Sequence, residues 1–285
     1  MYLKAALPAL PIVGQLPGIK HATGAIPDLT LTRGHVVTDP AHLEAYNEVC
    51  GFGLTDTLPG TYPHLAAFGL HMTLMTNTSF PFAPMGLVHL RNSITQHRPI
   101  NVSETLDVKV HADHLRPHPK GRLADVITVV TSDGDLVWEE VTTLFARGTG
   151  RGDETEPAPL AGVDAPVGPT RWRLGDDLGR RYAAVSGDRN PIHLYALTAK
   201  AFGFPRQIVH GMWTKARCLA ALEGRLPDAY RVDIEFRKPI LLPASVNFGA
   251  VQDAGAGATV FGVTSPSKAN DGASVSHLIG RVVPL

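Results

Sequence analysis

The sequence predicts an α+β fold built from two related halves, each with helices followed by several antiparallel strands. Three observations predict it. Similar blocks of sequence recur in the same order in the two halves. In each half, helical spacing of apolar residues precedes runs with the composition of strands. Residues 148–170 are rich in glycine, proline and acidic residues, so we interpret them as a linker between a first half, 1–147, and a second half, 171–285.

The internal repeat rests on three short matches. LEAYNEVCGF in the first half resembles LGRRYAAVSGD in the second, FPFAPMGLVHLRNSI resembles FGFPRQIVHGMWTKA, and HRPINVSETLDVKVHA resembles FRKPILLPASVNFGAV. The paired residues are Tyr46 with Tyr182, His89 with His210, and Pro99 with Pro239. The separation between partners differs from pair to pair, so insertions lie between the blocks while their order is kept. We therefore expect two copies of one fold.

In the first half, apolar spacing predicts a short helix over 42–52 and a longer helix over 86–96. Alternating and β-branched residues predict three strands after them. These strands are expected over 105–117, 123–135 and 136–148. The sequence Thr131-Ser132-Asp133-Gly134 has the composition of a hairpin turn, which would join the second of these strands to the third.

The second half repeats this plan. Helical spacing is present over 191–204 and 211–224, with Gly224 as the expected C-cap of the later helix. Strands are expected over 244–251, 258–265 and 274–285, with Gly255 and Gly257 in the turn between the first two. One principal helix and several strands in each half support the α+β class.

Composition narrows the classes of protein. Of 285 residues, 44% are hydrophobic, which is enough for a sizeable core. The formal net charge is +0, with 26 basic and 26 acidic residues, which argues against a nucleic-acid-binding protein. Two cysteines, Cys50 and Cys218, form no C-x-x-C pair, so a reducing cytoplasm is the expected setting. Prolines interrupt the N-terminus, and no run approaches the ~18 apolar residues of a membrane span, so we expect no signal peptide and no membrane insertion.

The stretch YAAVSGDRNPIH carries polar chemistry at the start of a helix. Gly187 permits a turn, and Pro191 suits the first turn of a helix. Asp188 can act as a carboxylate base, and His193, inside that turn, can act as its partner. Asn190 offers both a donor and an acceptor. This composition is also that of an ordinary helix-capping turn, so capping and acid/base chemistry are both open readings.

A second pair, His210-Gly211, precedes the predicted helix GMWTKARCLAALEG. The N–H of Gly211 would have no partner within that helix and would lie at the positive end of its dipole. Because glycine has no Cβ, a ligand carbonyl could approach this amide closely. A metal site formed by Asp188, His193 and His210 is a third reading, and the least favoured, since the chain lacks an H-x-x-x-H or cysteine cluster.

The motif Tyr-x-x-x-Ser-Gly-Asp-x-Asn-Pro-x-His, with FPRQIVHGMW and FRKPILLPASV downstream, resembles the MaoC-like, or type 2, enoyl-CoA hydratases. The resemblance covers most of 171–285 and is closest to the (R)-3-hydroxyacyl thioester dehydratases. It implies a double hotdog fold with an active second half. It also implies reversible addition of water to a trans-2-enoyl thioester carried on coenzyme A or acyl carrier protein in fatty-acid metabolism, without a metal or redox cofactor.

The resemblance implies roles for four residues. Asp188 and His193 would be the acid/base pair that holds the catalytic water, and Asn190 would orient this water. The Gly211 N–H would bind the thioester carbonyl oxygen. Three further residues are candidates for substrate binding, with cations meeting the phosphates of the carrier: His210, Arg237 and Lys238. Other nearby cations are Arg206, Lys215 and Arg217, for which ordinary surface positions are the simpler reading.

The first half departs from this motif. It has no Gly-Asp-x-Asn-Pro-x-His series, and Leu90 follows His89 where the second half has Gly211. We expect this half to do no chemistry, and either to shape the acyl pocket or to be structural. The segment FGLHMTLMTNTSFPF could line a channel, although such a stripe is more often core. Two other functions stay open, a hotdog acyl-thioesterase and a non-catalytic acyl-thioester-binding subunit, as do a monomer and a homodimer.

Overall fold

The computed structural model describes residues 25–84, 86–148, 159–253, 257–267 and 274–285. Ten antiparallel strands in these residues form one sheet, in the order β1-β3-β4-β5-β2-β7-β10-β9-β8-β6. The strands of the first half are β1 (Leu31–Val36), β2 (Leu87–Gln96), β3 (Leu106–His118), β4 (Gly121–Ser132) and β5 (Asp135–Arg147). Those of the second are β6 (Thr170–Leu174), β7 (Tyr230–Phe236), β8 (Ala244–Asp253), β9 (Ala258–Pro266) and β10 (Ser274–Pro284).

The two halves meet at the centre of this sheet. Strand β2 pairs with β7 in antiparallel register, Ser93 opposite Asp233, and the strand order on one side of this junction mirrors that on the other. Pro99 and Pro239 follow these two central strands, as their predicted match requires. The junction satisfies backbone groups that would otherwise form an open edge in each half. The α+β class and the two-copy organisation are therefore confirmed.

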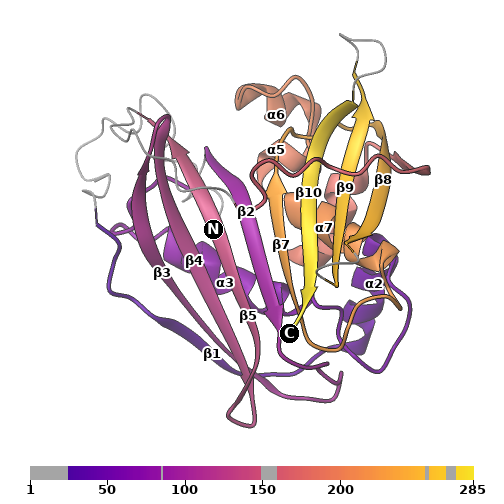
Figure 1. The fold of residues 1–285 in the computed structure, drawn as a ribbon. Helices are drawn as coiled ribbons and strands as arrows, with labels where there is room; N and C mark the ends of the chain where they lie inside the picture. Colours follow the sequence, from indigo (N-terminus) through magenta and orange to yellow (C-terminus); the bar gives the residue numbers. More distant parts are fainter. Residues whose placement is uncertain (1–24, 85, 149–158, 254–256, 268–273) are drawn as a thin grey trace.

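The helices lie on one face of the sheet. They are α2 (Pro40–Cys50), α3 (Pro63–Met75), α4 (Leu178–Ser186), α5 (Pro191–Leu194), α6 (Ala196–Ala201) and α7 (Gly211–Ala221). Figure 1 shows α3 behind the strands of the first half and α7 behind those of the second. Helices α2 and α4 pack against each other, with the rings of Tyr46 and Tyr182 6.4 Å apart. The predicted match of Tyr46 with Tyr182 therefore pairs residues in equivalent helices of the two halves.

The predicted helix over 86–96 is wrong, because Leu87–Gln96 is strand β2. Its side chains alternate between the two faces of the sheet, with Asn92, Ile94 and Gln96 buried. The main helix of the first half is instead α3, whose sequence PHLAAFGLHMTLM is apolar around most of its circumference. Such a helix has little one-sided periodicity, which is why the sequence pattern missed it.

The local predictions have different outcomes. The hairpin between β4 and β5 turns at Asp133 and Gly134, both with positive φ. The helix predicted over 191–204 is two short helices, α5 and α6, separated at Tyr195. Helix α7 ends at Ala221, so Gly224 is not its C-cap and lies in the turn that follows. Gly255, expected in the β8–β9 turn, lies outside the described residues.

The predicted linker, 148–170, lies partly outside the described residues. Its described part, 159–169, crosses the face of β10, β9 and β8 (Figure 1). Leu160 is fully buried, and its N–H donates to Glu235 Oε1 at 3.1 Å. A Cβ on Gly168 would lie 2.2 Å from the Phe248 carbonyl oxygen, so this segment packs directly on the backbone of β8. It therefore closes one surface of the second half.

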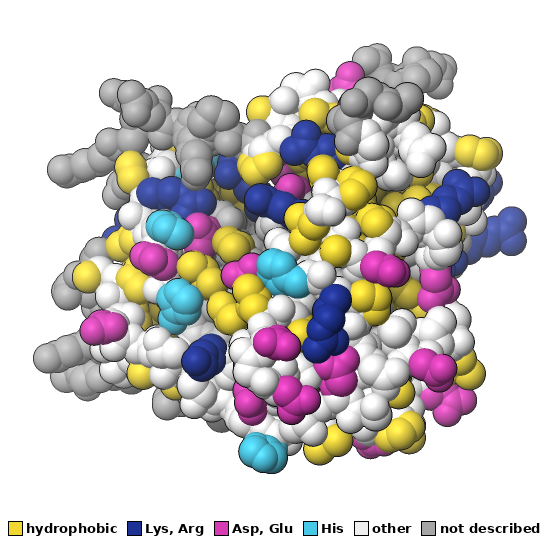
Figure 2. Space-filling view, turned by 60° about the horizontal axis from the view of Figure 1, so that its bottom comes forward, with side chains coloured by type: hydrophobic (Ala, Val, Ile, Leu, Met, Phe, Trp, Pro, Cys, Tyr) yellow, Lys and Arg dark blue, Asp and Glu magenta, His cyan; other side chains and the backbone are white. Residues whose placement is uncertain are grey.

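The charged side chains at the surface agree with the balanced numbers of acidic and basic residues in the sequence. Figure 2 shows acidic and basic side chains both spread over the face drawn there. None of the helices in the described part of the chain has the length and hydropathy needed to span a bilayer.

Candidate active site

A cavity of about 390 Å³ lies between the two halves. The first half contributes side chains of α3, β2, β4 and β5 to its wall, and the second contributes α4, the loop before α5, α7 and β7. All of the predicted site residues line it: Asp188, Asn190, His193, His210, Gly211, Arg237 and Lys238. The question whether the first half shapes the pocket is thereby answered, because the wall is built from both copies.

The loop between α4 and α5 positions the polar motif. Gly187 ends α4 in the left-handed conformation, with φ 74°. The Asp188 carboxylate then accepts from the Asn190 N–H at 3.1 Å, and the Asp188 N–H donates to Ser186 Oγ at 3.2 Å. Asn190 is the N-cap of α5 and Pro191 its first residue, as predicted, and the Asn190 side chain accepts from Ile192 N–H at 3.4 Å. Capping and presentation of the carboxylate thus occur together.

His193 is oriented by the backbone. Its Nδ1–H donates to the Ile208 carbonyl oxygen at 2.8 Å, and the ring is buried. Burial lowers the pKa of His193 below its usual 6.5, while Asp188 opposes this effect. The neutral imidazole therefore keeps its proton on Nδ1, and its Nε2 carries a lone pair that can accept a proton.

His210 stacks on His193, with ring centroids 3.8 Å apart. Its Nε2–H donates to the Asp188 carbonyl oxygen at 3.0 Å, and the same nitrogen lies 3.8 Å from Asp188 Oδ2. Burial, and next the neighbouring His193, lower the pKa of His210 to about 3, so the ring is neutral. His210 thus holds the Asp188 loop rather than binding substrate through Nε2.

The side chains of Asp188, His193 and His210 lie close enough to share a metal, with donor atoms within 4.8 Å of one another. Two of these nitrogens are already committed to backbone carbonyls, Nδ1 of His193 and Nε2 of His210. Two nitrogens of the imidazole pair carry no such bond to a described residue, His193 Nε2 and the buried Nδ1 of His210. This arrangement suits acid/base chemistry on water better than metal ligation.

Gly211 begins α7, so its N–H has no carbonyl partner within the helix, and the residue lines the cavity. The glycine is required for a reason that the sequence did not reveal. A Cβ at Gly211 would lie 2.9 Å from two carbons of the Phe236 ring, which backs this residue from β7. The amide is therefore held in place by packing against an aromatic ring.

Comparisons with known proteins show the family to which the chain belongs. Residues 162–259 match the MaoC like domain. The chain is 42% identical over 244 residues to 3-hydroxyacyl-thioester dehydratase X of Mycobacterium tuberculosis, covering 85% of each protein. The crystal structure of that protein, HtdX, superposes with a TM-score of 0.75 at 38% identity, covering 90% of this chain and 100% of that one. The chain belongs to the MaoC-like dehydratase family.

More distant relatives extend the comparison. A peroxisomal enoyl-CoA hydratase 2 of Arabidopsis thaliana is 28% identical over 187 residues, 60% of each chain. A M. tuberculosis protein described as a double hotdog fold superposes with a TM-score of 0.50 at 16% identity, covering 88% of this chain and 94% of that one. The mirrored sheet of this MaoC-like protein is the same double hotdog fold, as the sequence resemblance implied.

The cationic side chains that the sequence suggested for carrier binding lie in different places in this MaoC-like protein. Arg237 and Lys238 are exposed and line the cavity, so they lie where it meets solvent. The prediction that Lys215 lies at the surface is wrong, because the residue is fully buried. Its Nζ donates to Asn92 Oδ1. Arg217 stacks over the Trp172 ring at 5.0 Å and also lies away from the cavity wall.

The predicted equivalence of His89 and His210 is wrong. His89 lies within strand β2, not before a helix, and its ring packs edge-on against Phe236 at 4.8 Å. The N-terminus of α3, at Pro63 and His64, is the position in the first half that corresponds to the start of α7. Even so, His89 and His64 both line the cavity. No local motif marked His64, because its partners are distant in the sequence.

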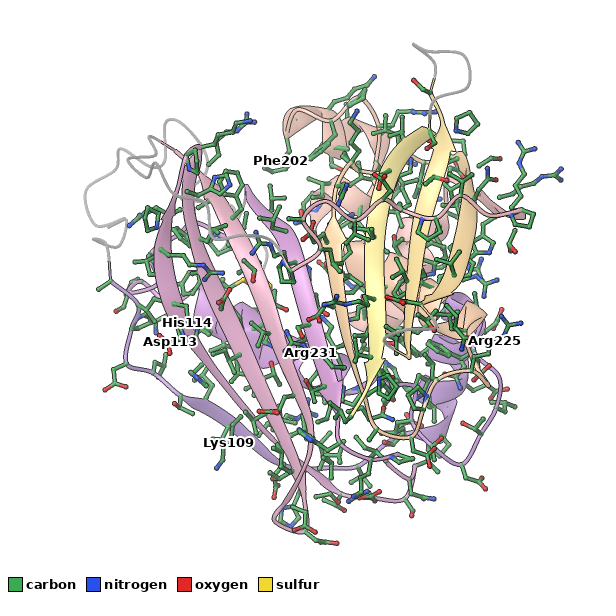
Figure 3. All side chains as sticks on the ribbon, in the orientation of Figure 1. Lys109, Asp113, His114, Phe202, Arg225 and Arg231 are labelled. Carbon is green, nitrogen blue, oxygen red and sulfur yellow. The ribbon has the colours of Figure 1, made fainter. Side chains whose placement is uncertain are left out.

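The apolar part of the wall also comes from the first half. Phe68, Met72 and Met75 of α3 line the cavity, so the stripe suspected of lining a channel does so. Phe202, which is labelled in Figure 3, follows the last residue of α6. It packs against Met72 of the first half. Helix α3 thus gives the cavity an apolar lining, in which Phe68 lies beside the Asp188 loop, 3.7 Å from where a Cβ on Gly187 would lie.

Proposed function

We propose that this protein is a hydro-lyase, an (R)-specific hydratase/dehydratase that interconverts trans-2-enoyl and (R)-3-hydroxyacyl thioesters. The observation that carries this proposal is one cavity wall bearing a free imidazole nitrogen of His193, the Asp188 carboxylate and the Gly211 amide. These groups supply a proton acceptor, a partner for water and a donor to a carbonyl oxygen. The identity to a 3-hydroxyacyl-thioester dehydratase supports the same activity.

The chemistry follows from where charge develops. The Gly211 N–H donates to the thioester carbonyl oxygen, at the positive end of the α7 dipole. Asp188 and His193 hold a water and remove one proton as its oxygen bonds to C3. The electrons of the C2–C3 double bond shift toward the carbonyl, giving an enolate that the amide stabilises. The removed proton then passes to C2, so one water is added overall.

Asn190 orients the reacting water in this proposal, and its backbone already fixes the Asp188 carboxylate. No redox cofactor takes part in this proposal, because protons and one water account for every atom and electron. No metal takes part either, because the Gly211 amide polarises the carbonyl and the Asp188–His193 pair activates the water. Arg237 and Lys238, exposed at the cavity wall, suit the phosphates of coenzyme A or of the phosphopantetheine of an acyl carrier protein.

We also propose that one chain is a complete functional unit, whether it stays a monomer or forms a homodimer. The site lies between two halves that already pair through β2 and β7. A role in cytoplasmic fatty-acid metabolism is part of the same proposal. Both cysteines are unpaired and buried, as expected in a reducing compartment.

The test separates this function from its two competitors. The protein is incubated with a trans-2-enoyl-CoA, and the absorbance of the conjugated thioester is followed together with free thiol. We expect the absorbance to fall without thiol release. An acyl-thioesterase would release thiol, and a non-catalytic binding subunit would change neither signal.

Asp188→Asn is expected to lower turnover at least ~100-fold, which is the scale of positioned acid/base catalysis. The matched control is Asp177→Asn, at an exposed carboxylate whose side chain makes no cap at the start of α4. Equal turnover of the wild type and Asp188→Asn would refute the proposed site.

A further inference from the structure

Part of the cavity wall is polar in a place that the hydration chemistry does not use. Three imidazoles of the first half line the cavity, from His64 and His71 of α3 and His89 of β2, and Thr142 of β5 lies with them. A plain alkyl chain gains nothing from such groups, because it offers them no hydrogen bond. Their presence points to a polar group on the bound molecule.

A buried network fixes the orientation of His64. Its Nδ1 lies 2.8 Å from Glu140 Oε2 and 2.9 Å from Oε1. Glu140 also accepts from Asn92 Nδ2 at 2.7 Å, and Lys215 Nζ donates to Asn92 Oδ1. Burial alone would raise the pKa of Glu140, but the charge and hydrogen bond of His64 lower it to about 2. The carboxylate is therefore ionised, and His64 carries its proton on Nδ1.

The hydrogen bond from Nδ1 to Glu140 leaves the opposite nitrogen, Nε2, to a ligand: Nε2 accepts a hydrogen bond in the neutral ring and donates one in the protonated ring. None of the described residues donates a hydrogen bond to that nitrogen. The His64 side chain is 9% exposed, and His64 lines the cavity wall. The Glu140 carboxylate thus fixes the orientation of the His64 ring before a ligand binds, so the site is preorganised.

His89 supplies an independent sign of a missing ligand group. Its Nε2 is buried and has no hydrogen-bond partner among the described residues. Burial lowers the pKa of His89 to about 3, so the ring is neutral and no charge compensates for the missing bond. A buried polar atom without a partner is costly, and a ligand that bonds to it removes this cost.

The same side chains do not favour a metal. Donor atoms of His64, His71 and Glu140 lie within 4.8 Å of one another. However, His64 and Glu140 are bound directly to each other, and His71 Nε2 is hydrogen-bonded to Thr128 Oγ1 at 2.7 Å. Glu140 also accepts a hydrogen bond from Asn92 Nδ2, so its oxygens are engaged by two protein donors.

We propose that His64 and His89 form a second subsite, which binds a hydroxyl group on the acyl chain away from the thioester. The favoured substrates of the proposed hydratase are then hydroxylated enoyl thioesters rather than plain ones. A hydroxyl fits because it can donate to Nε2 of a neutral His64 ring or accept from Nε2 of a protonated one. A carbonyl oxygen fits less well, because it only accepts and so bonds to one of these two forms. This inference rests on the proposed function, whose site shares the cavity.

The experiment compares kcat/KM for a trans-2-enoyl-CoA with that for analogues of equal length. In one series a hydroxyl is moved carbon by carbon along the distal part of the chain, and in another an oxo group replaces it. We expect the wild type to prefer the best hydroxylated analogue over the plain one by at least ~10-fold, since a site built for a hydroxyl rejects substrates that lack it. The oxo series should show a smaller preference.

Variants of His64 and His89 test whether these residues bind the hydroxyl group. In His64→Phe the preference should fall to about 1, with hydration of the plain substrate retained, and His64→Gln, which can still accept a hydrogen bond, should keep part of it. If His64→Phe fails to fold, His64→Gln and His89→Phe decide the question. The matched control is His97→Gln, which breaks another His–Glu pair, His97 with Glu139 at 2.9 Å, outside the cavity wall.

The outcomes are distinct. Hydration of plain and hydroxylated substrates with equal kcat/KM would overturn the subsite and leave the proposed function standing. An unchanged hydroxyl preference in the His64 and His89 variants would also overturn it. A protein inert toward every enoyl thioester would refute the proposed function, and the subsite with it.

Discussion

Acidification should destabilise this protein well above the pH at which its carboxylates protonate. His71 and His210 are both buried, with 3% and 2% exposure. Burial lowers the pKa of His71 to about 4 and that of His210 to about 3, from the usual 6.5. Between these values the unfolded chain binds protons that the folded protein does not bind. Stability is therefore full above pH 6.5 and is lost as pH falls toward the folded pKa values.

The size of the effect follows from these shifts. Lowering the pH from 7 to 5 should cost about 2 kcal/mol of unfolding free energy for each of these two histidines, and a similar amount for His89, whose pKa burial also lowers to about 3. The ionised Glu140, with its pKa lowered to about 2, contributes stability that is lost only below about pH 4.5, so it does not obscure this window. The loss between pH 7 and 5 thus reports on the buried imidazoles.

The assay is denaturant unfolding at the two pH values. His71→Gln removes the titrating group and can still bond to Thr128 Oγ1, which lies 2.7 Å from His71 Nε2. We expect its loss between pH 7 and 5 to be about 2 kcal/mol smaller than that of the wild type. Thr128→Val, the control, removes the hydroxyl but keeps the imidazole, so its loss should match the wild type. An identical pH dependence for wild type and His71→Gln would refute the argument.

Three further predictions concern other parts of the site. Gly211→Ala should lower both Tm and turnover, because its Cβ would lie 2.9 Å from the Phe236 ring, and a raised Tm would contradict this. Since burial lowers the pKa of His193, the acidic limb of the turnover profile should lie below pH 6.5, and a limb above that value would exclude His193 as the base. Lys215→Met should cost about 2 kcal/mol in denaturant unfolding, because Asn92 Oδ1 loses its buried donor; unchanged stability would argue against this bond.

The polar motif was predictable because its geometry is local. Gly187, Asn190 and Pro191 determine a turn and a helix start within five residues, and each follows its ordinary backbone preference. Asp188 and His193 are carried by that turn. The strands and hairpin of β3, β4 and β5 were predictable for the same reason, since alternation and turn residues act over short stretches.

The central strand β2 shows where local patterns failed. Its sequence LVHLRNSITQ has apolar residues at helical as well as strand spacing, and only its pairing with β5 and β7 makes it a strand. The mistaken match of His89 with His210 followed from the same error. Two similar tripeptides were given equivalent positions, although one lies inside a strand and the other before a helix.

The sequence by itself determined the α+β class, the repeated organisation and the turn that presents Asp188 and His193, because these depend on residues close together in the chain. Only the tertiary structure decided that His210 stacks on His193, that Phe236 backs Gly211, and that His64 meets Glu140 across 76 residues. Each of these contacts forms within one half, between segments that are distant in the sequence. Their physical cause is long-range packing, which no spacing in the sequence records.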